Sequence, residues 1–178
     1  MKAYRVHEYG DAAKFIEDEV NKPSAKQGHV VVEVKASSLN PVDHKLLKSD
    51  LGINPALPGI LHMDVAGVIT EVGEGVTAFK TGDEIYGCAG GLQGEAGNIE
   101  GALADFMLAD SNLIALKPKS LSFSESAALP LVTITAWEGL FDRAHIKKED
   151  HVLIHGGAGG VGHIAIQLAK QHGARVAT

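Results

Sequence analysis

The residues best placed to do chemistry lie in a glycine-rich turn near the end of the sequence. Gly157, Gly159 and Gly162 match the spacing G-x-G-x-x-G, between a short apolar run and an amphipathic helical pattern. The first glycine allows a tight turn, the second lets the backbone approach a pyrophosphate, and the third lets the helix pack on the strand. The pattern predicts a dinucleotide-binding turn that also includes Gly160 and Val161. A strand-to-helix turn without a ligand is the alternative.

Other kinds of catalytic site are not indicated. Cys88 is the only cysteine, so an internal disulfide and a zinc module built on two or more cysteines are both excluded. We recognise no Ser/His/Asp triad and no paired catalytic carboxylates, so hydrolase chemistry is not expected. A reactive thiol needs a partner base. We identify none for Cys88 and expect an inert small residue in a turn.

The elements around the glycine turn are predicted to follow the order strand, helix, strand. Residues 151–155 form a short apolar run, and residues 160–172 place their apolar side chains on one helical face. Gly173 is expected to end this helix. Residues 174–178 begin another strand, so the turn has the strand–helix context that its motif requires.

A helical segment is predicted before this unit. Ser122 and Glu125 form a capping-box pair that opens a short helix. Pro130 ends that helix and can serve as the first residue of the next one. In the second helix Trp137 follows the apolar spacing, and we expect it in the core.

Before residue 120 the sequence is mostly typical of strands. Alternating valines predict a half-buried strand over 30–36, and the apolar run 65–72 predicts a strand buried on both faces. Pro41 favours a short helix over 41–48. Further strands are expected at 84–88, 102–109 and 112–116.

Composition limits the class of protein. The 178 residues include 16 Lys and Arg against 22 Asp and Glu, a net charge of −6 that argues against nucleic acid as a partner. The 45% hydrophobic and 21% charged fractions are typical of a soluble globular protein. We find neither an apolar run of the ~18 residues that a membrane helix needs nor a signal peptide. No membrane association is expected, and the cytoplasm is the expected location.

Taken together, these segments resemble the medium-chain dehydrogenase/reductase superfamily. The resemblance rests on residues 63–87, 129–140 and 152–170. It implies a mixed α/β fold with a GroES-like β-rich catalytic domain (1–121), a helical connector (122–149) and the first βαβ of a Rossmann domain (150–178). A whole Rossmann domain needs roughly 100 further residues, so this interpretation predicts a truncated chain.

The resemblance also bears on zinc. Where the zinc alcohol dehydrogenases of the superfamily carry cysteine and histidine ligands, this sequence has Asn40 and Met63, and residues 88–101 contain only Cys88. The segment Asn-Pro-Val-Asp at 40–43 is similar to the zinc-independent quinone oxidoreductase branch. Zinc held by His62 with nearby carboxylate and thiol ligands is the weaker alternative, so no metal is expected.

The same resemblance implies the site residues. Asn40 is expected to donate its amide N–H to a substrate carbonyl or to hold the nicotinamide carboxamide, and its alternative role is to cap the helix that starts at Pro41. Asp43 is expected to orient its neighbours or the cofactor, and its alternative is a solvated carboxylate at the helix start. His62 is a candidate for proton relay. Thr135 is expected at the nicotinamide end of the cofactor, or bonded back to its own helix.

The function that follows is reduction of a quinone or enone with NADP or NAD, without zinc. The residue that discriminates the two cofactors is expected beyond Thr178, so the sequence itself does not choose between them. The resemblance favours NADP. The alternatives are an NADPH-binding protein without catalysis and a relative of the zinc alcohol dehydrogenases. The resemblance further implies a homodimer at full length, and the 178 residues alone are expected to be inactive.

Overall fold

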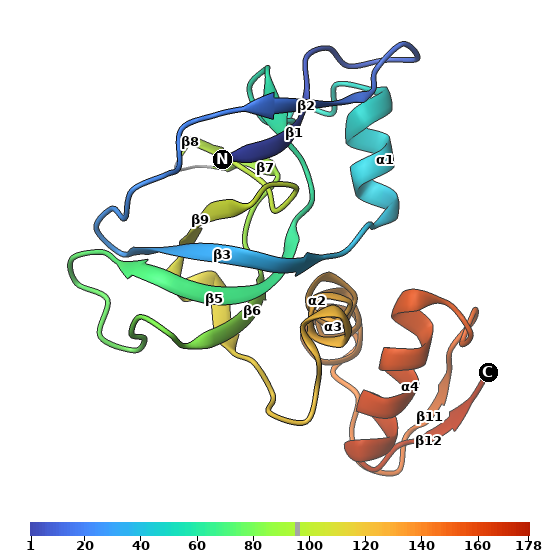
Figure 1. The fold of residues 1–178 in the computed structure, drawn as a ribbon. Helices are drawn as coiled ribbons and strands as arrows, with labels where there is room; N and C mark the ends of the chain where they lie inside the picture. Colours follow the sequence, from blue (N-terminus) through green and yellow to red (C-terminus); the bar gives the residue numbers. More distant parts are fainter. Residues whose placement is uncertain (95–96) are drawn as a thin grey trace. The chain divides into compact units, whose positions relative to one another are not determined.

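The computed structural model describes residues 1–94 and 97–178 (Figure 1). The chain divides into two compact units, Met1–Ala128 and Leu129–Thr178, and each has its own apolar core. The mixed α/β class is confirmed. The predicted domain boundaries at residues 121 and 149 stay predictions.

The first unit is built on a five-stranded antiparallel sheet in the order β10-β6-β5-β3-β9. Its strands are β3 (His29–Ser37), β5 (Asp64–Val72), β6 (Glu84–Cys88), β9 (Phe106–Asp110) and β10 (Ile114–Leu116). The predictions of strands over 30–36, 65–72 and 84–88 are confirmed. Val30 and Val32 are fully buried in its core. Val31 is fully buried as well, so the first half of β3 is buried on both faces and not half-buried as the alternation predicted. Figure 1 shows β3, β5 and β6 crossing this unit side by side.

A second sheet and a short hairpin were not predicted. The sheet has the order β2-β1-β4, and the hairpin pairs β7 with β8. Their bounds are β1 (Lys2–Val6), β2 (Phe15–Glu19), β4 (Gly59–Ile60), β7 (Leu92–Gly94) and β8 (Gly97–Ile99). Charged residues interrupt the apolar pattern of β1 and β2 in the sequence. They are accommodated by ion pairs between the two strands, such as that of Lys2 with Glu17 at 2.8 Å.

One helix and one 3₁₀ turn interrupt the strands. Helix α1 (Pro41–Lys48) has the predicted bounds and starts at Pro41. The turn η1 (Ser111–Leu113) lies between β9 and β10. The expected strands at 102–109 and 112–116 are present in shortened form, as β9 and β10.

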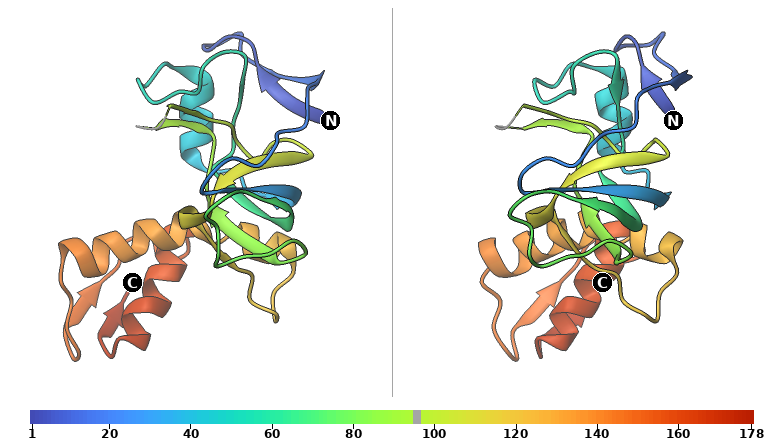
Figure 2. Two further views of the ribbon diagram at one scale, coloured as in Figure 1. Left: turned by 90° about the vertical axis from the view of Figure 1, so that its left-hand side faces the viewer. Right: turned by 60° about the vertical axis from the view of Figure 1, so that its left-hand side comes forward.

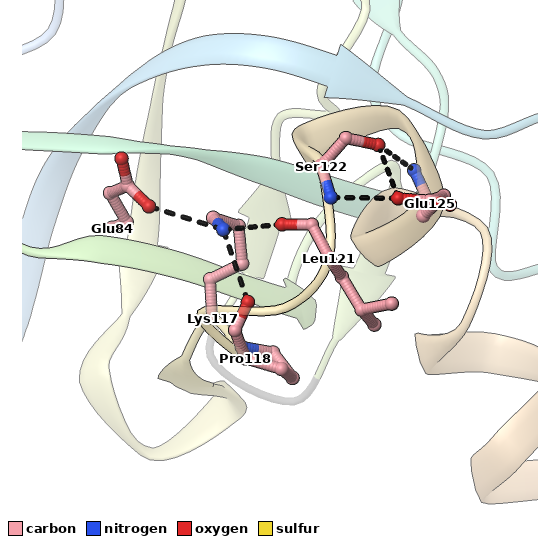
Figure 3. Close-up of polar contacts among 6 residues, drawn as sticks. All are labelled: Glu84, Lys117, Pro118, Leu121, Ser122 and Glu125. Carbon is pink, nitrogen blue, oxygen red and sulfur yellow. Dashed lines mark hydrogen bonds and ion pairs between the residues drawn. The ribbon is translucent and has the colours of Figure 1, made fainter.

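Helix α2 (Phe123–Ala127) closes the first unit and lies against β3 and β5. Ser122 and Glu125 form the predicted capping box. The segment before α2 is fixed by Lys117, whose Nζ donates to the carbonyls of Pro118 at 3.1 Å and Leu121 at 2.6 Å (Figure 3). Together with an ion pair to Glu84 at 3.1 Å, these bonds use the three N–H groups of the ammonium.

The second unit consists of helices around a parallel strand pair. Its elements are α3 (Pro130–Trp137), the π-helical turn η2 (Glu138–Arg143), β11 (His151–Leu153), α4 (Gly160–Gln171) and β12 (Arg175–Ala177). Figure 2 shows α4 beside the strands, and Ile164, Ala165 and Ala169 of α4 form the core with Val152 and Val176. The predicted strand–helix–strand order is confirmed.

The prediction for Trp137 was wrong. The indole is 51% exposed and lies against Phe141 with ring centroids 4.5 Å apart. The buried residues of this stretch are instead Ala136 and Leu140, because helix packing selects a different face from the one that apolar spacing suggested. None of the helices in the described part of the chain is long and apolar enough to cross a bilayer.

Candidate functional site

The first candidate region is a polar cluster in the first unit, where β3 leads into α1. Antiparallel pairing of β3 with β5 sets Ser37 opposite Val65, which brings the end of β3 to the start of β5. Asn40, the residue that precedes α1, donates its Nδ2 to Asp64 Oδ2 at 2.9 Å and to Ser38 Oγ at 3.2 Å. Ser38 Oγ donates to the same Asp64 oxygen at 2.7 Å. Both N–H groups of the Asn40 amide are therefore engaged inside the unit.

Asp43 is part of the same cluster and is 1% exposed. Its Oδ2 accepts the backbone N–H of Asn40 at 2.7 Å, which is one half of a capping box. The alternative of a solvated carboxylate was therefore wrong. Burial raises the pKa of Asp43, opposed by the backbone N–H of Asn40 and by the nearby His62. Its Oδ1 is buried without a hydrogen-bond partner among the described residues.

His62 lies beside these carboxylates in an unusual backbone conformation, with φ at 72°. Its Nδ1 is 3.1 Å from Ser37 Oγ, and the edge of Phe15 meets its ring at a centroid distance of 6.2 Å. Burial lowers the pKa of His62, opposed by the charges of Asp43 and Asp64. The ring is therefore neutral at pH 7.

The glycine-rich segment 87–101 supports His62. Its described part includes β7 and β8 and packs on the backbone of 60–63; residues 95–96 lie outside the description. A Cβ built on Gly91 would lie 3.0 Å from the carbonyl carbon of His62, and one on Gly101 would lie 1.9 Å from Leu61 O. The N–H of Ala102 donates to His62 O at 2.8 Å. Only glycine allows so close an approach.

Cys88 completes the cluster from β6, opposite Asp64 in the β5–β6 pairing. It ends a strand and does not lie in a turn as expected. Burial and the neighbouring Asp64 raise the pKa of its thiol to about 12, so the thiolate is scarce at neutral pH. Within the described residues, no three His, Cys, Asp or Glu side chains are grouped so that they could hold a metal ion.

The second candidate region is the glycine turn of the second unit. Gly159 precedes α4 in an extended conformation, and its N–H donates to Gly156 O at 2.9 Å. A Cβ on Gly162 would lie 2.2 Å from Gly156 O, so the third glycine of the motif is required by close packing. The positive φ of the turn, 74°, is at Gly156, one residue before the predicted motif.

The turn has the form that a pyrophosphate needs. The N–H groups of Gly160, Val161 and Gly162 lie in the first turn of α4 and have no intrahelical partner, and no side chain caps this N-terminus. A Cβ built on Gly160 would meet its nearest neighbour at an ordinary 3.5 Å, whereas one built on Gly159 would lie 3.2 Å from Gly156 O, a tight contact that favours glycine. The residues present therefore fit the phosphates of a dinucleotide.

Thr135 lies on α3, and its Oγ1 donates to Leu131 O at 2.8 Å. The hydroxyl is exposed and can still accept a hydrogen bond. The structure thus gathers Asn40, Asp43 and His62 in one unit and places Thr135 and the glycines in the other. Sequence reasoning missed Ser37 and Ser38, although two consecutive hydroxyls separated from Asn40 only by Leu39 were a visible signal.

Comparison with known proteins identifies the family. Residues 26–119 match the family described as the alcohol dehydrogenase GroES-like domain. The chain belongs to this family. The GroES-like match includes Asn40, Asp43 and His62, and the predicted resemblance to the medium-chain dehydrogenase/reductase superfamily is confirmed.

Relatives of this GroES-like chain are oxidoreductases. It is 42% identical over 173 residues to a 2-methylene-furan-3-one reductase of Solanum lycopersicum, covering 96% of the chain and 44% of the relative. It is 35% identical over 177 residues to the quinone oxidoreductase of Rattus norvegicus, covering 99% of the chain and 51% of the relative. The chain therefore spans about half the length of the curated relatives it matches.

Solved structures similar to this chain include proteins of the same superfamily. An alcohol dehydrogenase superfamily protein from Novosphingobium aromaticivorans superposes with a TM-score of 0.91 at 41% identity, over 99% of this chain and 52% of that one. The Escherichia coli quinone oxidoreductase complexed with NADPH gives 0.82 at 29% identity, over 99% and 51%.

Proposed function

We propose that the protein is an NADPH-dependent reductase of quinones or enones that works without zinc. The observation that carries this proposal is the uncapped glycine turn at the start of α4, in a chain whose GroES-like unit holds a buried cluster of polar side chains. The predicted division into a catalytic domain (1–121), a connector (122–149) and a cofactor-binding start (150–178) belongs to the same proposal.

The cofactor would be held by residues of the second unit. The backbone of Gly157, Gly159 and Gly160 would face the pyrophosphate, Val161 and Gly162 would set the helix start against it, and the Thr135 hydroxyl would accept from the nicotinamide amide. When bound, the reduced nicotinamide supplies the hydride. NADP is favoured over NAD because one relative from Arabidopsis thaliana is described as an NADPH-dependent alkenal/one oxidoreductase, and solved neighbours contain NADPH.

The absence of zinc chemistry is proposed from the donor set. The Asn40 amide turns its N–H groups toward Ser38 and Asp64, and an N–H group cannot ligate a metal ion. Met63, at the other ligand position implied by the resemblance, is 3% exposed and belongs to the core. Hydrogen-bond donors must then polarise the substrate carbonyl. Asn40 and Asp43 would act by holding the geometry of the cluster, and His62 would face the substrate.

Three further expectations remain proposals. The 178 residues alone would bind a dinucleotide weakly and be inactive, because the parallel sheet described here has only β11 and β12. The full-length protein would be a homodimer. The cytoplasm is the proposed location, with no nucleic acid or membrane as partner.

The test measures NADPH oxidation at 340 nm by the protein at its natural length, with a small quinone or a 2-alkenone as the substrate. Each assay is run in the presence and in the absence of a metal chelator. We expect turnover that the chelator leaves unchanged. Activity lost to the chelator and restored by zinc would contradict the proposal, and NADPH binding without turnover would favour the non-catalytic alternative. For the 178 residues, calorimetry should show no micromolar NADPH affinity; such affinity would contradict the prediction of weak binding.

A further inference from the structure

His62 occupies a backbone position that suits glycine. A non-glycine residue with φ at 72° carries a conformational cost, and such costs persist only where the surroundings determine them. Here the Gly91 backbone lies close to that of His62, because a Cβ built on Gly91 would lie only 3.0–3.1 Å from the N, C and O atoms of His62. Ala102 N–H holds the His62 carbonyl at 2.8 Å, and the His62 N–H stabilises the Asp43 carboxylate. The His62 backbone is therefore held by its neighbours, and the ring itself is held by Ser37 Oγ and Phe15.

The hydrogen-bond donors of the cluster are almost all engaged. Asn40 Nδ2 donates to Ser38 and Asp64, and Ser38 Oγ donates to Asp64. Ser37 Oγ has His62 Nδ1 as its partner at 3.1 Å. An incoming carbonyl oxygen therefore cannot take a donor from any of these groups without breaking an internal bond.

The other ring nitrogen of His62 differs from these donors. Among the described residues, the buried side-chain atoms without a partner are Arg5 Nε, Asp43 Oδ1 and Ser126 Oγ. His62 Nε2 is not one of them and has no hydrogen-bond partner in the described part of the chain, so it is open to solvent. When the Ser37 hydroxyl donates to Nδ1, the ring proton resides on Nε2.

We propose that His62 is the substrate-facing donor of this cluster: a neutral imidazole that offers Nε2–H to the carbonyl oxygen of a quinone or enone. In this arrangement Ser37 fixes the tautomer, and Gly91 and Asp43 are positioning residues that hold the His62 backbone. The role is a hydrogen bond and transfers no proton. The inference rests on the proposed function for its substrate class, but the tautomer and the positioning do not depend on turnover.

The first experiment determines the tautomer in the 178-residue chain, by long-range ¹H–¹⁵N correlation of the His62 ring at pH 7.5. We expect a single Nε2–H tautomer in the wild type and a mixture in Ser37→Ala. A wild-type Nδ1–H tautomer, or an unchanged tautomer in Ser37→Ala, would overturn the assignment.

The second experiment tests positioning with two glycines of similar conformation. Gly91 has φ at 74° and touches His62, whereas Gly75 has φ at 82° and nothing within 4 Å of its would-be Cβ. Gly91→Ala should shift the resonances and the titration of the His62 ring. Gly75→Ala should leave both unchanged, although an alanine would be equally strained at its positive φ. Equal effects of the two substitutions would refute a positioning role. If Gly91→Ala does not fold, Asp43→Asn replaces it with the same expected shift.

The third experiment uses cyclohex-2-enone as the probe at millimolar concentration. In the wild type it should shift the His62 Nε2 resonance and the resonances of the neighbouring Ser37 and Phe15. In His62→Asn the shifts at Ser37 and Phe15 should disappear. No shift at His62 in a chain that has the Nε2–H tautomer would overturn the donor role. That result would still allow the reductase activity, which the NADPH assay tests separately.

Discussion

The polar cluster of the first unit and the glycine turn of the second unit are built on opposite principles. In the cluster, side chains bond mainly to one another; Asn40, Asp43 and Asp64 are buried, and the others are half-buried. In the turn, side chains are almost absent, and the backbone N–H groups at the start of α4 face outward without a cap. A site that binds through backbone stays open and local in sequence, whereas a site made of side chains must satisfy its groups internally and leave few of them for a ligand.

Thiol reactivity gives the largest expected contrast between the two regions. Cys88 has a pKa near 12 against an ordinary 9.0, so its thiolate fraction is about a thousandfold lower. A thiol placed in the turn, Ala158→Cys in a Cys88→Ser background, is exposed and should react at an ordinary rate. Labelling with a disulfide reagent at pH 8 measures both. Comparable rates would show that the cluster is not closed.

Removing the central acceptor of the cluster should cost the most stability. Asp64→Ala removes the acceptor that the buried Asn40 amide and the Ser38 hydroxyl share, and we expect a loss of about 3 kcal/mol in the free energy of unfolding. Hydrogen exchange of β5 amides measures the change in the first unit. Asp142→Ala, at an exposed position, is the control and should change stability by less than about 0.5 kcal/mol. If Asp64→Ala lost as little stability as the control Asp142→Ala, the cluster would not be held by its internal hydrogen bonds.

The turn should respond to a methyl group only where its backbone is closely packed. Gly162→Ala sets a Cβ 2.2 Å from Gly156 O, whereas Gly160→Ala meets Val132 at an ordinary 3.5 Å. We expect Gly162→Ala to destabilise the second unit by about 2 kcal/mol and Gly160→Ala to be neutral. Trp137, the only tryptophan, reports unfolding of this unit by fluorescence. Equal tolerance at both positions would contradict the close packing.

The smallest expected effect is the pH dependence of the first unit. Because the pKa of His62 is lowered from 6.5 in the folded state, the unfolded chain binds a proton more readily. The free energy of unfolding should therefore fall as the pH drops from 6.5 to the folded pKa. The raised pKa of Asp43 has the opposite sign, with stability falling as the pH rises from 3.8 to its folded value. In urea unfolding, His62→Asn should reduce the difference in the free energy of unfolding between pH 7 and pH 5. An unchanged difference would exclude His62 as the source of this pH dependence.

The same difference explains what the sequence could predict. The turn and α4 follow from local spacing, as do α1 at Pro41 and the capping box at Ser122, because each depends on neighbours within a few residues. The cluster could be named only in part, since the β3–β5 register and the approach of Gly91 and Gly101 to the backbone of 60–63 are non-local. Strand β1 was missed because its charges at Lys2 and Arg5 are three residues apart and interrupt the period-2 alternation. The positive φ of His62 has no signature in its own residue type.

The bonds of Lys117 have a consequence for chemical labelling. With its side chain 5% exposed and its ammonium held by Pro118 O, Leu121 O and Glu84, this amine cannot reach an acylating reagent while β10, α2 and β6 keep their places. The other lysines of the chain would be modified first, and Lys117 would gain its label only when the first unit opens. The rate of Lys117 labelling, followed by mass spectrometry, would therefore report the rate at which the first unit opens.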